Sequence, residues 1–228
     1  MITDKVPIKE VFSSFQGEGI FLGVRQIFVR FAQCNLNCSF CDEKIKIVKY
    51  SLSINQLIKR IHTLEKKSGP HHSISFTGGE PLLYKDYLNQ LFPRLKKNFK
   101  IYLETNGTLF NSLKALINFF DFISMDIKLP SSTEQRDFFK DHIKFLKIAR
   151  KKNIFVKTVV TKNTLMKDFK KAVEIIEEVN KDIPFIIQPV TAKDNMDLKK
   201  LFTFYTIAKA SLSDVRIIPQ IHRFLGIK

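Results

Sequence analysis

The three cysteines of this 228-residue chain lie within eight residues, at Cys34, Cys38 and Cys41. Thiolates are preferred ligands of iron–sulfur clusters, and three of them can hold three irons of a cubane while the fourth iron stays open to another ligand. A purely electron-carrying cluster normally uses a fourth cysteine, which this sequence lacks. The spacing therefore favours a reactive cluster. The cysteines alone leave two alternatives open, a zinc site completed by a distant histidine and simple buried thiols, whereas disulfides would leave one thiol over.

Further polar clusters directly follow apolar segments, at residues 16–19, 77–81, 104–107, 126–128 and 188–190. Gln16 and Glu18 are expected to project from the loop after the first strand. Gly78 and Gly79 lack side chains, so their backbone could approach a ligand closely, although an ordinary turn would also explain them. Glu80 would then either contact that ligand or brace the loop.

Apolar segments with strand-like patterns alternate with amphipathic segments along the whole chain. Strands are predicted at residues 6–13, 25–33, 73–76, 101–103, 122–125, 155–160, 185–187 and 215–218, and helices at about 53–67, 84–97, 112–119, 133–151, 164–179, 198–210 and 219–225. This alternation predicts an α/β fold with a parallel sheet and right-handed crossovers. About six βα units are fewer than a closed eight-fold barrel needs, so we expect an incomplete, TIM-like βα barrel of about six parallel strands. Active sites of parallel α/β folds collect after the strands, where the polar clusters fall.

Length and composition favour one compact domain, residues 1–228, because 44% of the residues are hydrophobic and no linker interrupts the pattern. The first residues lack the apolar run of a secretory signal, and no segment is apolar enough to span a bilayer, so we expect a cytoplasmic protein without membrane contact. The net charge of +16 would suit an anionic partner. The lysines, however, are spread along predicted helices, which indicates a solvated surface and disfavours nucleic-acid binding.

The cysteine loop after a strand, Phe40 before the last cysteine, and Gly78-Gly79-Glu80-Pro81 after the next core strand resemble the radical S-adenosylmethionine superfamily. Within it, the motifs at residues 15–19, 28–30, 41–42, 104–107, 188–190 and 219–222 resemble the 7-carboxy-7-deazaguanine synthase family. The resemblance covers about residues 11–228. It implies an N-terminal strand and loop that bind substrate and a C-terminal segment that contacts it.

The resemblance implies a 4Fe-4S cluster on the three cysteines, with S-adenosyl-L-methionine bound to the open iron. Electron transfer would cleave a carbon–sulfur bond and release a carbon radical. The residues expected to bind the cofactor are Phe40, Asp42, Gly78, Gly79, Glu80, Glu104, Asp126, Lys128 and Gln188. No side chain is predicted as a catalytic acid or base, because the radical comes from the cofactor.

The implied reaction is a lyase reaction of queuosine biosynthesis. It converts 6-carboxy-5,6,7,8-tetrahydropterin to 7-carboxy-7-deazaguanine by ring contraction and loss of ammonia. Arg30 can bind the substrate carboxylate as a fork, and Gln16 and Glu18 can meet the donor–acceptor edge of the pterin. The residues expected to bind substrate are Phe15, Gln16, Gly17, Glu18, Arg30, Thr77 and His222. Strand alternation leaves open whether Arg25 or Arg30 faces the site.

Two positions depart from the family pattern. Glu43 stands where the family commonly has a threonine that binds Mg²⁺; a carboxylate is also a hard ligand, so Glu43 is a candidate magnesium ligand. Asp126-Ile127-Lys128 stands where many members have Ser-Pro-Lys. It is also familiar from activating enzymes of glycyl-radical proteins, which form the same-class alternative.

An alternative of another class is a non-catalytic, cluster-carrying RNA-binding or sensor protein. For the synthase, the implied partners are a flavodoxin- or ferredoxin-type reductant, which the basic surface would suit, and a second copy of the chain in a homodimer.

Overall fold

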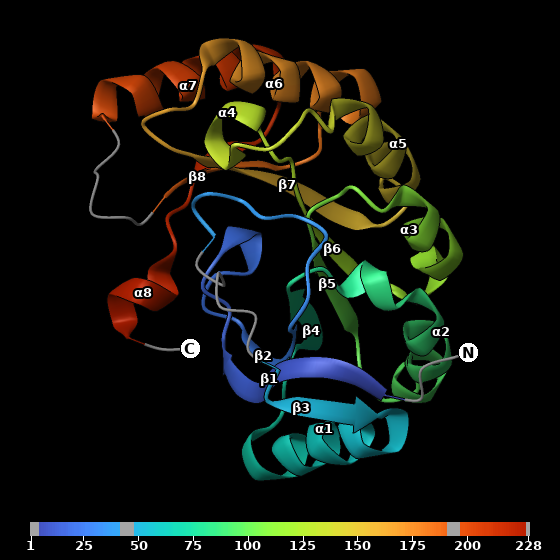
Figure 1. Ribbon diagram of the computed structural model, residues 1–228. Helices are drawn as coiled ribbons and strands as arrows, with labels where there is room; N and C mark the ends of the chain where they lie inside the picture. Colours follow the sequence, from blue (N-terminus) through green and yellow to red (C-terminus); the bar gives the residue numbers. More distant parts are fainter. Residues whose placement is uncertain (1–4, 42–47, 191–196, 227–228) are drawn as a thin grey trace.

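The computed structural model describes residues 5–41, 48–190 and 197–226 (Figure 1). Nine strands form one sheet in the order β3-β1-β2-β4-β5-β6-β7-β8-β9. Their bounds are β1 Lys5–Phe15, β2 Arg25–Phe31, β3 Tyr50–Ser53, β4 Ser73–Gly78, β5 Ile101–Thr105, β6 Phe122–Asp126, β7 Asn153–Val160, β8 Phe185–Pro189 and β9 Val215–Ile217. β1 pairs antiparallel with both β2 and β3, and each neighbouring pair from β2 to β9 is parallel.

The sheet confirms the α/β fold and the incomplete barrel. β3 and β9 are the two edges of the sheet, so the barrel is not closed within the described residues. Seven strands are mutually parallel, β2 and β4 to β9, where about six were expected. The four residues of β3 were not predicted as a strand, because they merge into the start of the following helix.

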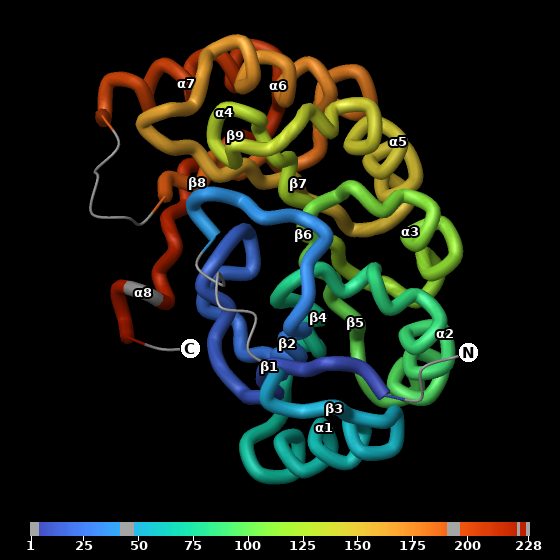
Figure 2. Tube along the Cα trace, viewed as in Figure 1, coloured from blue at the N-terminus to red at the C-terminus, as the bar shows by residue number. Residues whose placement is uncertain are grey.

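Most of the helices cover the convex side of the curved sheet (Figures 1 and 2). Their bounds are α1 Ile54–Ser68, α2 Lys85–Leu95, α3 Phe110–Leu116, α4 Pro130–Thr133, α5 Phe139–Ala149, α6 Met166–Asn180, α7 Leu198–Ser211 and α8 Ile221–Leu225, with 3-10 turns η1 Gly19–Phe21, η2 Pro81–Tyr84 and η3 Ile117–Phe119. The core lies between these helices and the sheet. Phe169 of α6, for example, is fully buried and stacks on Phe204 of α7 with ring centroids 4.3 Å apart. No helix within the described ranges is both long and apolar enough to cross a membrane.

The start of α1 shows why the sequence specifies this helix locally. Ser53 Oγ accepts a hydrogen bond from the Gln56 amide at 3.4 Å, and Gln56 Oε1 accepts one from the Ser53 amide at 2.9 Å. This capping box satisfies two amides that the first helical turn leaves without partners. Leu57 and Ile61 then face the core and are fully buried, which confirms the predicted helix.

The long helix predicted over residues 133–151 is wrong. α4 ends at Thr133, Glu134 takes a left-handed conformation with φ of 56°, and α5 begins only at Phe139. Asp137 contributes to this break, because its side chain accepts a hydrogen bond from the Phe139 amide at 2.6 Å and so starts a new helix. The break leaves the Thr133 carbonyl to accept a hydrogen bond from the Ser39 amide at 3.0 Å, within the cysteine loop.

Candidate active site

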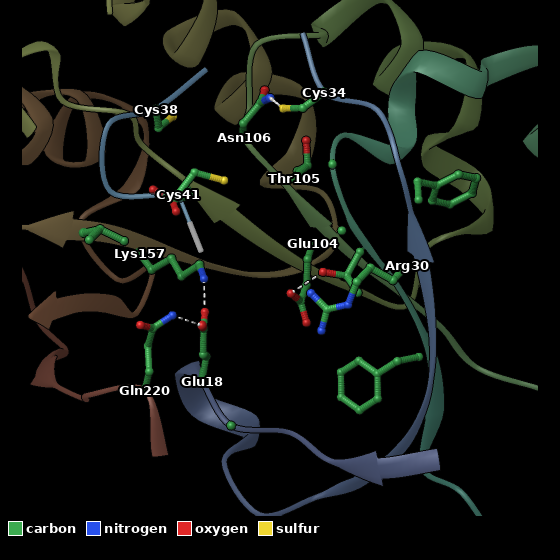
Figure 3. A pocket seen from close by; sticks show the side chains of 18 of the residues that line it. Glu18, Arg30, Cys34, Cys38, Cys41, Glu104, Thr105, Asn106, Lys157 and Gln220 are labelled. Carbon is green, nitrogen blue, oxygen red and sulfur yellow. Dashed lines mark hydrogen bonds and ion pairs between the residues drawn. The ribbon is translucent and has the colours of Figure 1, made fainter. Parts of the chain in front are cut away.

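A cavity of about 540 Å³ lies near the carboxyl ends of the parallel strands. Figure 3 shows the cysteine loop on one side of this cavity and Glu18, Lys157 and Gln220 on another. Of the predicted site residues that the structure describes, all but Glu80 line it: Phe15, Gln16, Gly17, Glu18, Arg30, Cys34, Cys38, Phe40, Cys41, Thr77, Gly78, Gly79, Glu104, Asp126, Lys128, Gln188 and His222. Asp42 and Glu43 lie outside the described residues, so the predicted magnesium ligand stays a prediction.

The cysteine loop is held by contacts that its own sequence does not reveal. Cys38 is buried and packs with Leu36 against Phe138, which follows the break between α4 and α5. Cys34 Sγ accepts hydrogen bonds from the Leu36 amide at 3.4 Å and from Asn106 Nδ2 at 3.8 Å. These contacts hold Cys34 and Cys38 in place at the cavity.

The donor set fits an iron–sulfur cluster. All three cysteines are free thiols that line one cavity. Within the described residues, no three His, Cys, Asp or Glu side chains converge as ligands of a single ion. A cubane instead places each thiolate on a different iron, which requires sulfurs spread around a larger space. Burial raises the pKa of the Cys34 thiol and raises that of Cys38 to about 11, so binding a cluster would release protons from this loop.

Gly78 and Gly79 pack against the segment that leads into Cys34. Gly78 has φ of +102°, and a Cβ there would lie 2.5 Å from the Phe31 carbonyl oxygen. A Cβ on Gly79 would lie 1.7 Å from the Gln33 carbonyl oxygen. The two glycines are therefore required by backbone packing, which sequence analysis missed. Both also line the cavity, and their contact with a ligand stays a prediction.

Glu80 is fully buried behind the cavity, which favours the bracing interpretation over direct ligand contact. Its carboxylate accepts hydrogen bonds from the Leu82 amide at 3.1 Å, from Thr105 Oγ1 at 2.9 Å and from the Asn106 amide at 2.8 Å. Burial raises its pKa to about 7, although these hydrogen bonds favour the charged form. Glu80 thereby links the turn after β4 to the turn after β5, which carries the Asn106 contact to Cys34.

Gln16 lies in the loop after β1 and lines the cavity, but its side-chain amide is bonded within the protein. Only 4% of its surface is exposed, and its amide nitrogen donates to Glu104 Oε1 at 2.7 Å and to Gln26 Oε1 at 3.1 Å. Gln16 Oε1 accepts a hydrogen bond from the Glu18 backbone amide at 3.1 Å. Glu104 also accepts hydrogen bonds from Ser75 Oγ at 3.0 Å and Thr77 Oγ1 at 2.8 Å. The Glu104 carboxylate is therefore held by three side chains at the edge of the cavity.

Glu18 forms an ion pair with Lys157 and accepts a hydrogen bond from Gln220 Nε2 at 2.7 Å (Figure 3). Burial raises the pKa of Glu18, but the charge and hydrogen bond of Lys157 outweigh it and lower that pKa to about 2. The same pairing raises the pKa of Lys157 despite its burial. Sequence analysis missed Lys157. The available signal was one charged residue inside the otherwise mostly apolar segment 154–160.

Arg30, and not Arg25, faces the cavity. Arg25 is exposed at the start of β2. Arg30 pairs in register with Thr77 of β4, and its guanidinium carbon lies 5.7 Å from the centroid of the Phe12 ring. This placement agrees with the predicted role of Arg30 as the ligand of a carboxylate.

The C-terminal segment reaches the loop after β1. The Ile221 amide donates to the Gly17 carbonyl oxygen at 3.0 Å, and a Cβ on Gly17 would lie 2.4 Å from His222 Nδ1. Only a glycine therefore lets His222 approach this closely. Together with Gln220, His222 lines one wall of the cavity, and the contact of this segment with substrate stays a prediction.

Asp126 and Gln188 both line the cavity, and each has one buried side-chain oxygen, Asp126 Oδ1 and Gln188 Oε1, without a hydrogen-bond partner among the described residues. The other Asp126 oxygen pairs with Lys128 Nζ at 2.7 Å, and Lys128 Nζ lies 5.4 Å from the centroid of the Phe40 ring. Buried polar atoms are normally satisfied, so such oxygens indicate a place where a polar ligand donates hydrogen bonds. The residues present therefore fit a polar cofactor beside the cysteines.

Comparisons with known proteins agree with this architecture. Residues 28–179 match the family model of the Radical SAM superfamily. The chain is 42% identical to the 7-carboxy-7-deazaguanine synthase of Geobacter sulfurreducens over 96% of each chain, and 34% identical to that of Methanothermobacter thermautotrophicus over 100% of each. The crystal structure of QueE from Escherichia coli shares the fold with a TM-score of 0.63 and 22% identity over 93% of each chain. The chain thus belongs to the radical SAM superfamily, within the family of 7-carboxy-7-deazaguanine synthases.

Proposed function

We propose that this chain converts 6-carboxy-5,6,7,8-tetrahydropterin to 7-carboxy-7-deazaguanine, with ring contraction and loss of ammonia. The observation that carries the proposal is one cavity of about 540 Å³ shared by three thiols and a set of charged groups from both ends of the chain. Its volume suits a small, polar molecule together with part of a cofactor.

Within this cavity, Cys34, Cys38 and Cys41 would hold the cluster, and the open oxygens of Asp126 and Gln188 would accept hydrogen bonds from S-adenosyl-L-methionine. When bound, the cluster and S-adenosyl-L-methionine supply the carbon radical that removes a hydrogen atom from the substrate.

The remaining charged residues would orient the substrate. Arg30 offers a planar fork for the substrate carboxylate, and Glu18 offers acceptors for its N–H edge. Gln16 would act indirectly, because its amide is already bonded to Glu104. The Thr77 hydroxyl donates a hydrogen bond to Glu104, so Thr77 Oγ1 can still accept a hydrogen bond from substrate.

The cavity disfavours the alternative of an activating enzyme for a glycyl-radical protein. Such an enzyme must admit a polypeptide loop to its cofactor. Here Gln220 and His222 of the C-terminal segment line the cavity, and the segment is held there by hydrogen bonds from Gln220 to Glu18 and from the Ile221 amide to the Gly17 carbonyl oxygen. The motif that favoured this alternative, Asp126-Ile127-Lys128, forms an internal ion pair between Lys128 and Asp126, which is compatible with either enzyme.

We further propose an electron donor, a homodimer and a reducing compartment for this chain. A small acidic flavodoxin- or ferredoxin-type protein would supply the electron, since the net charge of +16 favours an acidic partner. A second copy of the chain would form a homodimer, which light scattering at micromolar concentration would test. The free thiols favour a reducing compartment such as the cytoplasm.

The decisive experiment is anaerobic reconstitution of the cluster, followed by reduction and incubation with S-adenosyl-L-methionine and carboxy-tetrahydropterin. We expect 7-carboxy-7-deazaguanine by liquid chromatography and mass spectrometry. Cys38→Ala should lose both the cluster and cofactor cleavage, whereas Lys147→Met, which removes an exposed ion pair to Glu178, should retain both. Cofactor cleavage without deazaguanine would refute the substrate assignment. Activity that survives removal of divalent metal would argue against a magnesium site at Glu43.

A further inference from the structure

The carboxylate of Glu18 is held from two sides by residues far away in the sequence. Lys157 Nζ of β7 binds Oε2, and Gln220 Nε2 of the C-terminal segment donates to Oε1 at 2.7 Å. The Glu18 backbone is also fixed, because its amide donates to Gln16 Oε1 at 3.1 Å. Its side chain is only 17% exposed, and what remains exposed lines the cavity.

This carboxylate stays charged in its buried position. The charge of Lys157 keeps the pKa of Glu18 low against the effect of burial. Lys157 in turn stays protonated because Glu18, Asp126 and Glu104 all surround it with negative charge. The Glu18 carboxylate therefore stays ionised at the cavity, with its charge balanced by Lys157.

Each carboxylate oxygen has two acceptor sites, about four in all. Lys157 occupies one site on Oε2 and Gln220 occupies one on Oε1, which leaves one site on each oxygen. A carboxylate with one remaining acceptor site on each oxygen can accept from two adjacent N–H donors, as in the fork geometry of bidentate pairs. A carboxylate that rotated freely would not keep both sites aligned.

We propose that Lys157 and Gln220 are positioning residues that fix Glu18 as a two-oxygen acceptor, and that this acceptor selects ligands with two adjacent N–H donors. The inference rests on the proposed function, in which the donors are the ring N–H and the exocyclic amine on the pyrimidinone side of the pterin. The product keeps the same pair of donors, so it serves as a stable probe of this contact.

A purely structural role is the rival interpretation, because the same contacts tie the C-terminal segment to the loop after β1. A structural tie would affect every ligand of the cavity equally. A positioning role would affect only the discrimination between ligands that carry both donors and ligands that lack one. The ratio of two affinities therefore separates the two interpretations.

The test measures the binding of 7-carboxy-7-deazaguanine and of 7-carboxy-7-deazahypoxanthine, which lacks the exocyclic amine, to the reconstituted enzyme with S-adenosyl-L-methionine by calorimetry. The wild type should prefer the amine-bearing ligand by about tenfold or more, as expected for a charge-assisted hydrogen bond. Lys157→Met should reduce this ratio to within about threefold of unity, and Lys157→Arg should keep more of it because the charge and donors remain. Lys147→Met, the matched control from an exposed Lys–Glu pair, should leave the ratio unchanged.

Thermal unfolding and iron content check that each variant is folded. Should Lys157→Met fail to fold, Gln220→Leu replaces it, and a reduced ratio supports the inference in the same way. Two results overturn the inference when the wild type still converts the substrate. The first is a folded variant with an unchanged ratio of the two affinities, and the second is a wild type that binds both ligands equally well. A wild type that does not convert the substrate overturns the proposed function itself.

Discussion

Substitution of Gly79 by alanine tests the packing of the cysteine loop most directly. The added Cβ would lie 1.7 Å from the Gln33 carbonyl oxygen, 2.3 Å from its carbonyl carbon and 3.0 Å from the Cys34 amide nitrogen. All three are backbone atoms, so no side-chain rotation relieves the contact. Overpacking of this kind costs about 1 to 3 kcal/mol, and we expect the upper end because the two backbones must separate. That is a large part of the ~5 to 15 kcal/mol that stabilises a typical domain.

Urea unfolding of the cluster-free protein measures the stability change, and iron and sulfide analysis after reconstitution measures the consequence for the cluster. Because Gln33 directly precedes Cys34, Gly79→Ala should lower iron content as well as stability. Gly23→Ala is the control. Gly23 has φ of +80° but no atom within 4 Å of its added Cβ, so it should cost only the backbone strain of about 1 kcal/mol and leave iron content intact.

The packing argument would be refuted if the free energy of unfolding of Gly79→Ala lay within about 0.5 kcal/mol of the wild-type value and the variant bound iron normally. Retained stability and iron with weakened S-adenosyl-L-methionine binding would instead support a role of this glycine in ligand approach.

Three further predictions follow from single contacts. Arg30→Lys should raise KM for the pterin carboxylate by about tenfold, because lysine cannot form two parallel hydrogen bonds to a carboxylate. The control Arg25→Lys, at an exposed site, should leave steady-state kinetics unchanged. Equal effects of the two substitutions would exclude Arg30 as the carboxylate ligand. The ion pair lowers the pKa of Glu18 from 4.5 to about 2, so its ionisation adds at most about 3 kcal/mol to the free energy of unfolding. This contribution is present above pH 4.5 and is lost as the pH falls toward 2. Glu18→Gln should therefore flatten the stability profile over that pH window in urea titrations, and an unchanged slope would contradict the ion pair. Ser53→Ala should destabilise the chain by about 1 kcal/mol in urea unfolding through loss of the cap of α1, and no measurable loss would show that tertiary contacts alone hold this helix.

The sequence alone determined features that depend on neighbours along the chain. The capping box of Ser53 and Gln56 joins residues three apart, so the start of α1 could be predicted. The alternation of strands and helices fixed the parallel sheet, because crossovers of this length return the chain in the same direction. The clustering of Cys34, Cys38 and Cys41 indicated a reactive iron–sulfur site for the same local reason.

Tertiary structure decided which side chains these elements bring together. Glu18 contacts Lys157, 139 positions away in the sequence, and Gln220, 202 positions away. The spacing of residues along helices and strands does not predict contacts at such separations. The break between α4 and α5 was missed because residues 134–137 contain neither glycine nor proline to mark it. The hydrogen bond from the Ser39 amide to the Thr133 carbonyl oxygen, which lies at this break, joins segments far apart in the sequence. The three thiolates follow from local sequence, whereas the shape and charge of the cavity beside them exist only once the strands are aligned.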